Sequence, residues 1–237
     1  MFGYIVIVGI SSLIGMGISG KLKSKFAHYS KVPLRSGMTG AEVAKKMMDH
    51  FGIYDVNIVQ GKGMLTDHYN PQTKTVSLSP AVFNGRSIAS AAVAAHECGH
   101  VVQHAEAYSM LTMRSNLVPL VQMSSKLQQL LFFAMVAGLA SGIFGNIFMI
   151  VLLATFGITA LFSLVTLPVE FDASNRALAW IEDAGIAHGA ELNGAKDSLW
   201  WAAMTYVAKA MSSLVLFLFI VILIFICFYP VLLFKMI

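Results

Sequence analysis

Charged side chains are scarce in this sequence. Asp, Glu, Lys and Arg make up 12% of its 237 residues, whereas hydrophobic residues make up 57% and the mean hydropathy is +0.72. Soluble domains seldom combine so little charge with so much apolar sequence. The composition therefore argues against an ordinary soluble enzyme and favours a membrane protein.

Cysteine is nearly absent too. Cys98 lies inside a short polar motif and Cys227 inside an apolar run, so the two predict no disulfide framework. The formal net charge of +4 does not indicate nucleic acid, because no block of Lys and Arg is interleaved with aromatic residues. We expect no nucleic-acid partner, and the sequence gives no indication of an oligomeric state.

Three uncharged runs are long enough to cross a bilayer, which takes about 20 helical residues. Residues 2–19 lack the basic start and the small-residue cleavage site of a signal peptide, so we interpret them as an uncleaved anchor. Residues 127–169 are about twice as long as one crossing requires and carry turn residues at 141–146, which predicts a hairpin. With the run at 210–234, the sequence predicts about four transmembrane helices.

These runs divide the chain into five segments. They are a first transmembrane helix at 1–20, a polar module at 21–126, a transmembrane hairpin at 127–169, a polar helical segment at 170–209 and a last transmembrane helix at 210–237. Lys21, Lys23 and Lys25 follow the first span, and basic residues favour the cytoplasmic side. We therefore expect a multi-pass protein of the cell membrane with both polar segments in the cytoplasm.

The polar module has the sequence signals of mixed structure. Residues 39–42 form a capping box that begins a helix ending near His50. Short strands are expected at 56–60, 64–69 and 73–79, with a turn at 70–72, and Ser87 can cap a further helix. The fold class predicted is mainly α with a small β-sheet (α+β), combined with membrane helices.

The motif HECGH lies on that last helix. Residues four apart share a helix face, so His96 and His100 can both bind one zinc ion. Glu97 is rotated about 100° around the axis, which places its carboxylate beside the open coordination position, where a general base is needed. Zinc brings the pKa of bound water down to about 7, so the pattern predicts zinc-dependent hydrolysis.

A catalytic zinc ion usually takes three protein ligands, so a third is needed. The candidates are His104, Glu106, Glu170, Asp172, Glu182, Asp183, His188 and Glu191. His104 is too far along the helix to join the first pair, and the longer metzincin pattern fails at Val102 and Glu106. Glu170 is the leading candidate, because the predicted hairpin returns it to the side of His100. The alternative is an interfacial carboxylate that ends a membrane helix.

Several other residues near the motif have possible roles. Ser174 lies four residues after Glu170 and can orient a ligand imidazole, although a capping or solvated serine is an equal alternative. The small residues Cys98 and Gly99 indicate tight helix packing. Substrate can add to the edge of the strand at 73–79, unless that strand is purely structural. No spacing selects the group that stabilises an oxyanion from His68, His104, Tyr108, His188 and Tyr206.

Four stretches carry a resemblance to a known family. They are DHYNPQTKTVSLSP at 67–80, SIASAAVAAHECGHVVQHAEAY at 87–108, LPVEFDASNRA at 167–177 and AAMTYVAKA at 202–210. In these stretches the chain resembles the YugP-like neutral zinc metallopeptidases and, more distantly, the HtpX-like membrane proteases.

The resemblance implies a zincin-like module of gluzincin type. His96 and His100 would be zinc ligands, Glu97 the catalytic carboxylate and Glu170 the third ligand. HtpX-like proteins carry an aspartate four residues after that ligand, where this chain has Ser174, and Asp172 belongs to another helical face.

The function predicted is a membrane-bound zinc endopeptidase with one Zn²⁺ ion. Its partners would be the lipid bilayer and protein or peptide substrates in or near the membrane. The alternative from another class is a zinc-stabilised membrane scaffold or binding module without turnover. Intramembrane proteolysis is less favoured, because the HECGH helix follows a polar, strand-forming module.

Overall fold

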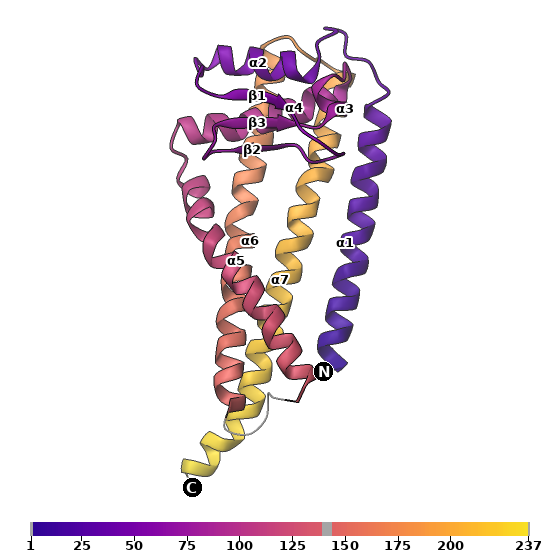
Figure 1. Ribbon diagram of the computed structural model, residues 1–237. Coiled ribbons are helices and arrows are strands. Elements are labelled where there is room, and N and C mark those ends of the chain that lie inside the picture. Colours follow the sequence, from indigo (N-terminus) through magenta and orange to yellow (C-terminus); the bar gives the residue numbers. More distant parts are fainter. Residues whose placement is uncertain (1, 139–143, 237) are drawn as a thin grey trace. The chain divides into compact units, whose positions relative to one another are not determined.

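The computed structural model describes residues 2–138 and 144–236 (Figure 1). Within them the chain is mainly helical with one small sheet, as predicted. The elements are α1 (Phe2–Tyr29), α2 (Gly40–His50), β1 (Asn57–Gln60), β2 (His68–Asn70), β3 (Thr75–Leu78), α3 (Pro80–Phe83), α4 (Ile88–Ala105), α5 (Ser109–Val136), α6 (Phe144–Asp183) and α7 (Ala190–Met236).

The chain divides into two compact units. One, the polar unit, consists of residues 16–112 and 167–206, and the other, the apolar unit, consists of residues 1–15, 113–166 and 207–237. Each unit is therefore assembled from separate stretches of sequence. Helices α1, α5, α6 and α7 each contribute residues to both units.

Local sequence signals account for the first elements of the polar unit. The hydroxyl of Thr39 accepts from the backbone N–H of Glu42, whose carboxylate in turn accepts from the N–H of Thr39. This confirms the predicted capping box at the start of α2, where it satisfies two backbone donors that the helix leaves open. The predicted cap of α4 is also present, since the Ser87 hydroxyl accepts from the N–H of Ser90.

The three strands pair in the order β1-β3-β2. β1 runs parallel to β3, with Asn57 opposite Thr75, and β2 runs antiparallel to it, with Tyr69 opposite Val76. β3 is therefore paired on both sides and has no open edge. The expectation that the strand at 73–79 offers an edge to substrate is wrong, because its backbone donors and acceptors are used within the sheet. The free edges belong to β1 and β2.

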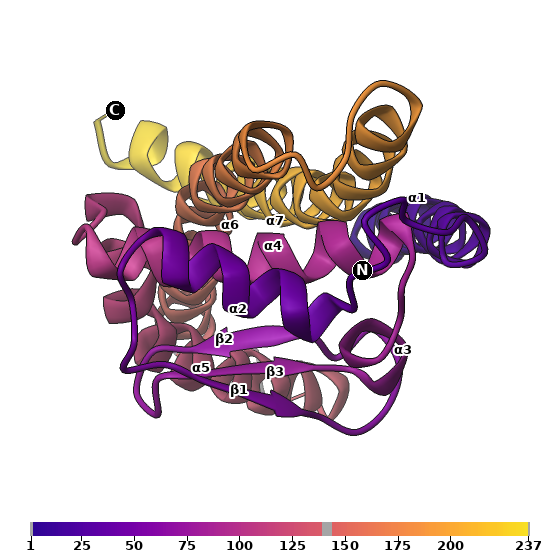
Figure 2. The same ribbon diagram turned by 90° about the horizontal axis from the view of Figure 1, so that it is seen from above.

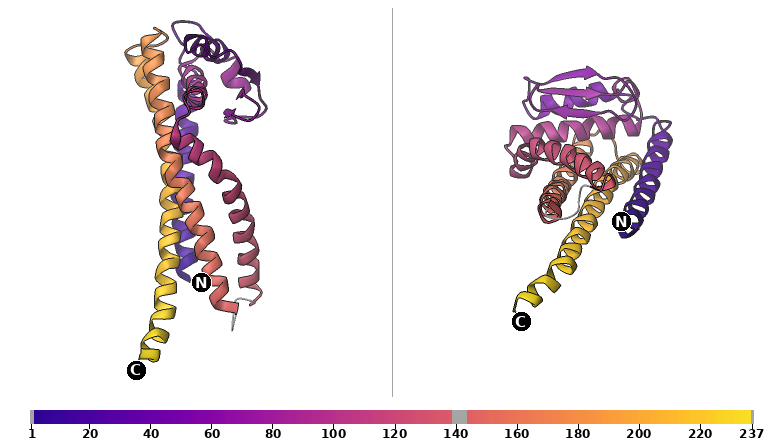
Figure 3. Two further views of the ribbon diagram at one scale, coloured as in Figure 1. Left: turned by 90° about the vertical axis from the view of Figure 1, so that its left-hand side faces the viewer. Right: turned by 60° about the horizontal axis from the view of Figure 1, so that its bottom comes forward.

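Helices α2 and α4 cover one face of this sheet (Figures 2 and 3). Alternate residues of β3 point into the core they form, and Val76 and Leu78 are completely buried. Small residues fill the contact face of α4, including Ala92 and Ala95. The sheet thus fixes α4 in place, and α4 carries the HECGH motif.

Helix α1 continues beyond the predicted first span, to Tyr29. Near its end, the carboxylate of Asp197 on α7 accepts from the Lys25 ammonium at 2.6 Å and from the Tyr29 hydroxyl at 2.8 Å. These polar contacts lie within the polar unit, which explains why the helix extends past the uncharged run.

In the apolar unit, α5 and α6 run in opposite directions (Figures 1 and 3). Part of the predicted turn, 141–143, lies outside the described residues, and 144–146 already belong to α6. The Gln128 amide donates to the Thr159 hydroxyl at 3.1 Å, which joins the two helices.

The expectation of four membrane spans is wrong for the part of the chain described. Three helices are long and apolar enough to cross a bilayer, namely Gly3–Tyr29, Ile147–Asp183 and Ala190–Ile226. The first half of the predicted hairpin belongs to α5, which also contains Arg114, Lys126 and several glutamines. These polar residues leave α5 too short an apolar stretch for one crossing.

Candidate metal centre

Two helices of the polar unit approach closely at the HECGH motif. A Cβ atom at Gly99 of α4 would lie 2.5 Å from the carbonyl oxygen of Ala173 on α6. Only a residue without a side chain permits this approach. The tight packing predicted for Gly99 is confirmed, and it brings α6 within reach of the histidines on α4.

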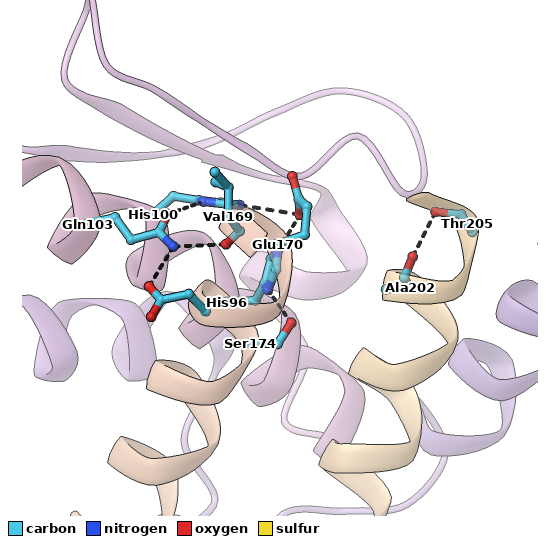
Figure 4. A network of polar contacts seen from close by, with 9 residues as sticks. His96, His100, Gln103, Val169, Glu170, Ser174, Ala202 and Thr205 are labelled. Carbon is cyan, nitrogen blue, oxygen red and sulfur yellow. Dashed lines mark hydrogen bonds and ion pairs between the residues drawn. The ribbon is translucent and has the colours of Figure 1, made fainter. Parts of the chain in front are cut away.

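His96, His100 and Glu170 come together at this contact (Figure 4). The Oε2 atom of Glu170 lies 3.3 Å from Nε2 of His96 and 3.6 Å from Nε2 of His100. All three side chains are largely buried, and the imidazole rings meet edge to face. In the described part of the chain, this is the group of His, Cys, Asp and Glu side chains that could hold a metal ion.

The donor set fits zinc. Two ligand atoms bound at about 2.0–2.1 Å in a tetrahedral arrangement lie about 3.3–3.4 Å apart, close to the distances between Glu170 and the two histidines. Two imidazole nitrogens and one carboxylate oxygen are also ligands of catalytic zinc sites, which keep a fourth position open. The three ligand atoms all lie within 4.8 Å of one another.

Each histidine makes a second contact through its other ring nitrogen. Nδ1 of His96 lies 3.1 Å from the Ser174 hydroxyl, and Nδ1 of His100 lies 3.0 Å from Oε1 of Gln103 (Figure 4). Such contacts hold the rings in the orientation that metal binding requires. The geometry agrees with the orienting interpretation of Ser174, whereas no motif in the sequence points to Gln103.

The hydrogen bonds of Gln103 define the protonation of His100. The Gln103 amide nitrogen lies 2.8 Å from the carbonyl oxygen of Val169 and 2.7 Å from the carboxylate of Asp172, and both of these groups only accept. The amide oxygen must therefore face His100, whose Nδ1 must donate to it. The lone pair of a neutral His100 is then on Nε2, which faces Glu170.

Asp172 extends this network toward the end of α4. Its carboxylate also accepts from Nε of Arg176 at 2.6 Å, and the Arg176 guanidinium bonds to Glu106 at 2.6 Å. Asp172 and Glu106, two of the candidate third ligands, thus pair with an arginine and lie outside the metal cluster. Asp172 does belong to another face of α6 than Glu170, and from there it positions Gln103.

Glu97 is buried in the same region. Burial raises the pKa of its carboxyl group, the two histidines counteract this, and the charges of Glu170 and Asp67 raise it further. Burial alone would lower the pKa of His100, but its hydrogen bond to Glu170 and the charges of the two glutamates raise it. A carboxylate of raised pKa accepts a proton more readily than an exposed one.

The other predicted site residues that the structure describes are not members of the metal cluster. His104 lies about one turn beyond His100 on α4, and its Nδ1 bonds to the Tyr69 hydroxyl at 2.8 Å. It is not part of the metal cluster. Tyr206 is half-buried on α7, and its role stays a prediction. Cys98 points away from the histidines, toward the carbonyl of Ala44.

The family model described as "Putative neutral zinc metallopeptidase" matches residues 4–225. The chain belongs to this family. Among curated proteins, the chain is similar to the "Putative membrane protease YugP" of Bacillus subtilis (strain 168). The two are 44% identical over 194 residues, which cover 82% of this chain and 84% of the relative. No solved structure matches. For a zinc metallopeptidase family, the cluster of His96, His100 and Glu170 supplies a suitable ligand set.

Proposed function

We propose that the protein is a membrane-bound endopeptidase whose zinc ion is held by His96, His100 and Glu170. The observation that carries this proposal is the convergence of two imidazoles and one buried carboxylate at distances that suit one ion. The membrane-protease relative and the three candidate membrane helices support a substrate in or close to the bilayer.

Each residue of the site has a role in this proposal. A bound zinc ion would polarise the scissile carbonyl and make water more acidic. Glu97 would take the proton of the attacking water and deliver it to the leaving amine, a task that suits a carboxylate beside the open coordination position. Gln103 and Ser174 would hold the two imidazoles, and burial of the site would exclude bulk water.

The substrate backbone would pair with the free edge of β2. This strand is antiparallel to β3, exposes one edge, and lies against α4, the helix of the motif. An extended peptide can add to such an edge through backbone hydrogen bonds. This proposal replaces the strand at 73–79 as the substrate-binding edge.

We also propose that the site faces the cytoplasm. Lys21, Lys23 and Lys25 lie within the polar unit, near the end of α1, and nearly all the basic residues of the chain fall in 21–126 and 170–209. Basic residues near membrane helices favour the cytoplasmic side.

The test compares Glu97→Gln with Glu170→Gln in the full-length protein. Glu97→Gln should keep zinc and lose about 10²-fold or more of peptide cleavage, because the base is removed and the ligands remain. Glu170→Gln should lose both zinc and cleavage. Glu182→Gln, a change of an exposed carboxylate on α6, serves as the matched control. Cleavage that persists in Glu97→Gln would refute the mechanism.

A further inference from the structure

The apolar unit contains basic side chains but no acidic side chains. Residues 113–166 contain Arg114 and Lys126 but no Asp or Glu, and the stretches 1–15 and 207–237 contain no Asp or Glu either. Every acidic residue of the chain thus belongs to the polar unit. Lys126 has no carboxylate in its own unit that could serve as a counterion.

Lys126 lines an apolar groove between α5 and α6. The groove has a volume of about 600 Å³, within the range of ligand-binding pockets. Its α5 side includes Met123 and Leu130 and its α6 side includes Ile150, and these three side chains are 68%, 64% and 60% exposed. The α6 side belongs to the candidate membrane span Ile147–Asp183, so hydrocarbon is the expected surrounding.

Contacts within the unit preform this groove. The hydrogen bond from Gln128 to Thr159 joins α5 and α6 beside it. Ser124 and Thr155, one from each helix, are buried at its base, and the Thr155 hydroxyl bonds to the carbonyl of Leu152. The two walls are therefore held together without an occupant that bridges them.

We propose that this groove binds one anionic phospholipid, whose acyl chain lies along the apolar walls and whose phosphate pairs with Lys126. A cation beside hydrocarbon is costly unless it has a counterion, and the unit contains none. Basic pockets between membrane helices commonly bind acidic headgroups. An apolar peptide helix in the groove would cover Lys126 without neutralising it, which makes lipid the better match.

The test measures lipid retained by the full-length protein in nanodiscs of phosphatidylglycerol and phosphatidylcholine, followed by native mass spectrometry. The wild type should retain phosphatidylglycerol preferentially. Lys126→Gln should lower this preference about fivefold, the effect of one basic residue at an anionic surface. Lys62→Gln, which removes an exposed lysine of the polar unit, should leave it unchanged.

A second variant tests the groove itself. Ala154→Phe places a ring among the groove residues and should reduce retention of the lipid while Lys126 is intact. Circular dichroism establishes that both variants are folded. Equal retention of the two lipids by the wild type, or unchanged retention in Lys126→Gln, would overturn the proposal. Displacement of all bound lipid by a transmembrane peptide would also overturn it, because the groove would then be a peptide site. A wild-type dimer that becomes a monomer in Ala154→Phe would overturn it as well, because the groove would then be a contact between two copies of the chain.

Discussion

Gln103 and Ser174 contact the two histidines in different ways. A serine hydroxyl can donate or accept, so Ser174 orients His96 without fixing which nitrogen carries the proton. Gln103 has no such freedom, because Val169 and Asp172 both require its N–H groups. The amide of Gln103 thus contacts Nδ1 of His100, a position that a carboxylate often occupies beside a metal-binding histidine. Because the amide is neutral, it adds no further negative charge beside Glu97 and Glu170.

Replacing Gln103 by leucine should weaken zinc binding about 10- to 100-fold, since that is the usual effect of losing a group that supports a ligand. Leucine has a similar size but leaves Nδ1 of His100 and the carbonyl of Val169 without this partner. Competition with a chelator measures the dissociation constant.

The exposed Gln72 offers a matched control, and Gln72→Leu should bind zinc as the wild type does. An unaltered dissociation constant in Gln103→Leu would show that the amide does not position His100.

At the scale of helices and strands, local signals were sufficient for α2 and α4. The capping residues Thr39 and Ser87 lie next to the helices that they begin, and the HECGH spacing defines a single helix face. The strand order β1-β3-β2 could not be read from the sequence, because it depends on pairing between separate segments. The extent of α5 also differs from the prediction. The sequence places a border between the polar module and the hairpin at 126/127, but residues on both sides of that border form one helix.

The contact between α4 and α6 gives a prediction at this scale. Gly99→Ala should weaken zinc binding more than 10-fold and destabilise the protein by about 1–3 kcal/mol, as overpacking usually does. The new methyl group would meet the backbone of Ala173, so the helices must separate and Glu170 moves away from the histidines. Zinc titration and thermal unfolding measure the two effects.

Gly20→Ala is the corresponding control. A Cβ atom at Gly20, on α1, meets nothing within 4 Å. This variant should bind zinc normally and unfold at the same or a slightly higher temperature, because alanine favours a helix more than glycine does. Equal zinc binding by both glycine variants would contradict the role assigned to the close contact.

For the whole molecule, the separation of charge is the main organising feature. All acidic side chains belong to the polar unit, whereas the apolar unit contains only the basic residues Arg114, Lys126, Lys209 and Lys235. Sequence composition was enough to predict a membrane protein with an embedded polar module. It was not enough to count the spans, because α5 is 28 residues long but only partly apolar, with Arg114 and Lys126 along it.

The orientation of the polar unit can be measured in cells. A cysteine introduced by Lys62→Cys lies on an exposed part of this unit. A reagent that cannot cross membranes should label it only after the cells are permeabilised, because the basic residues favour the cytoplasmic side.

The unmodified chain controls for Cys98, which is buried, and for Cys227. Labelling at position 62 in intact cells would reverse the proposed orientation.

The order of the ligands along the chain has a consequence for synthesis. His96 and His100 leave the ribosome first, and Glu170 follows only after all of residues 113–166 have been translated. A nascent chain that ends before Glu170 lacks one of the three groups of the metal cluster. The complete ligand set therefore becomes available only after residues 113–166 have been made, so a product of translation interrupted before Glu170 would lack a complete metal cluster.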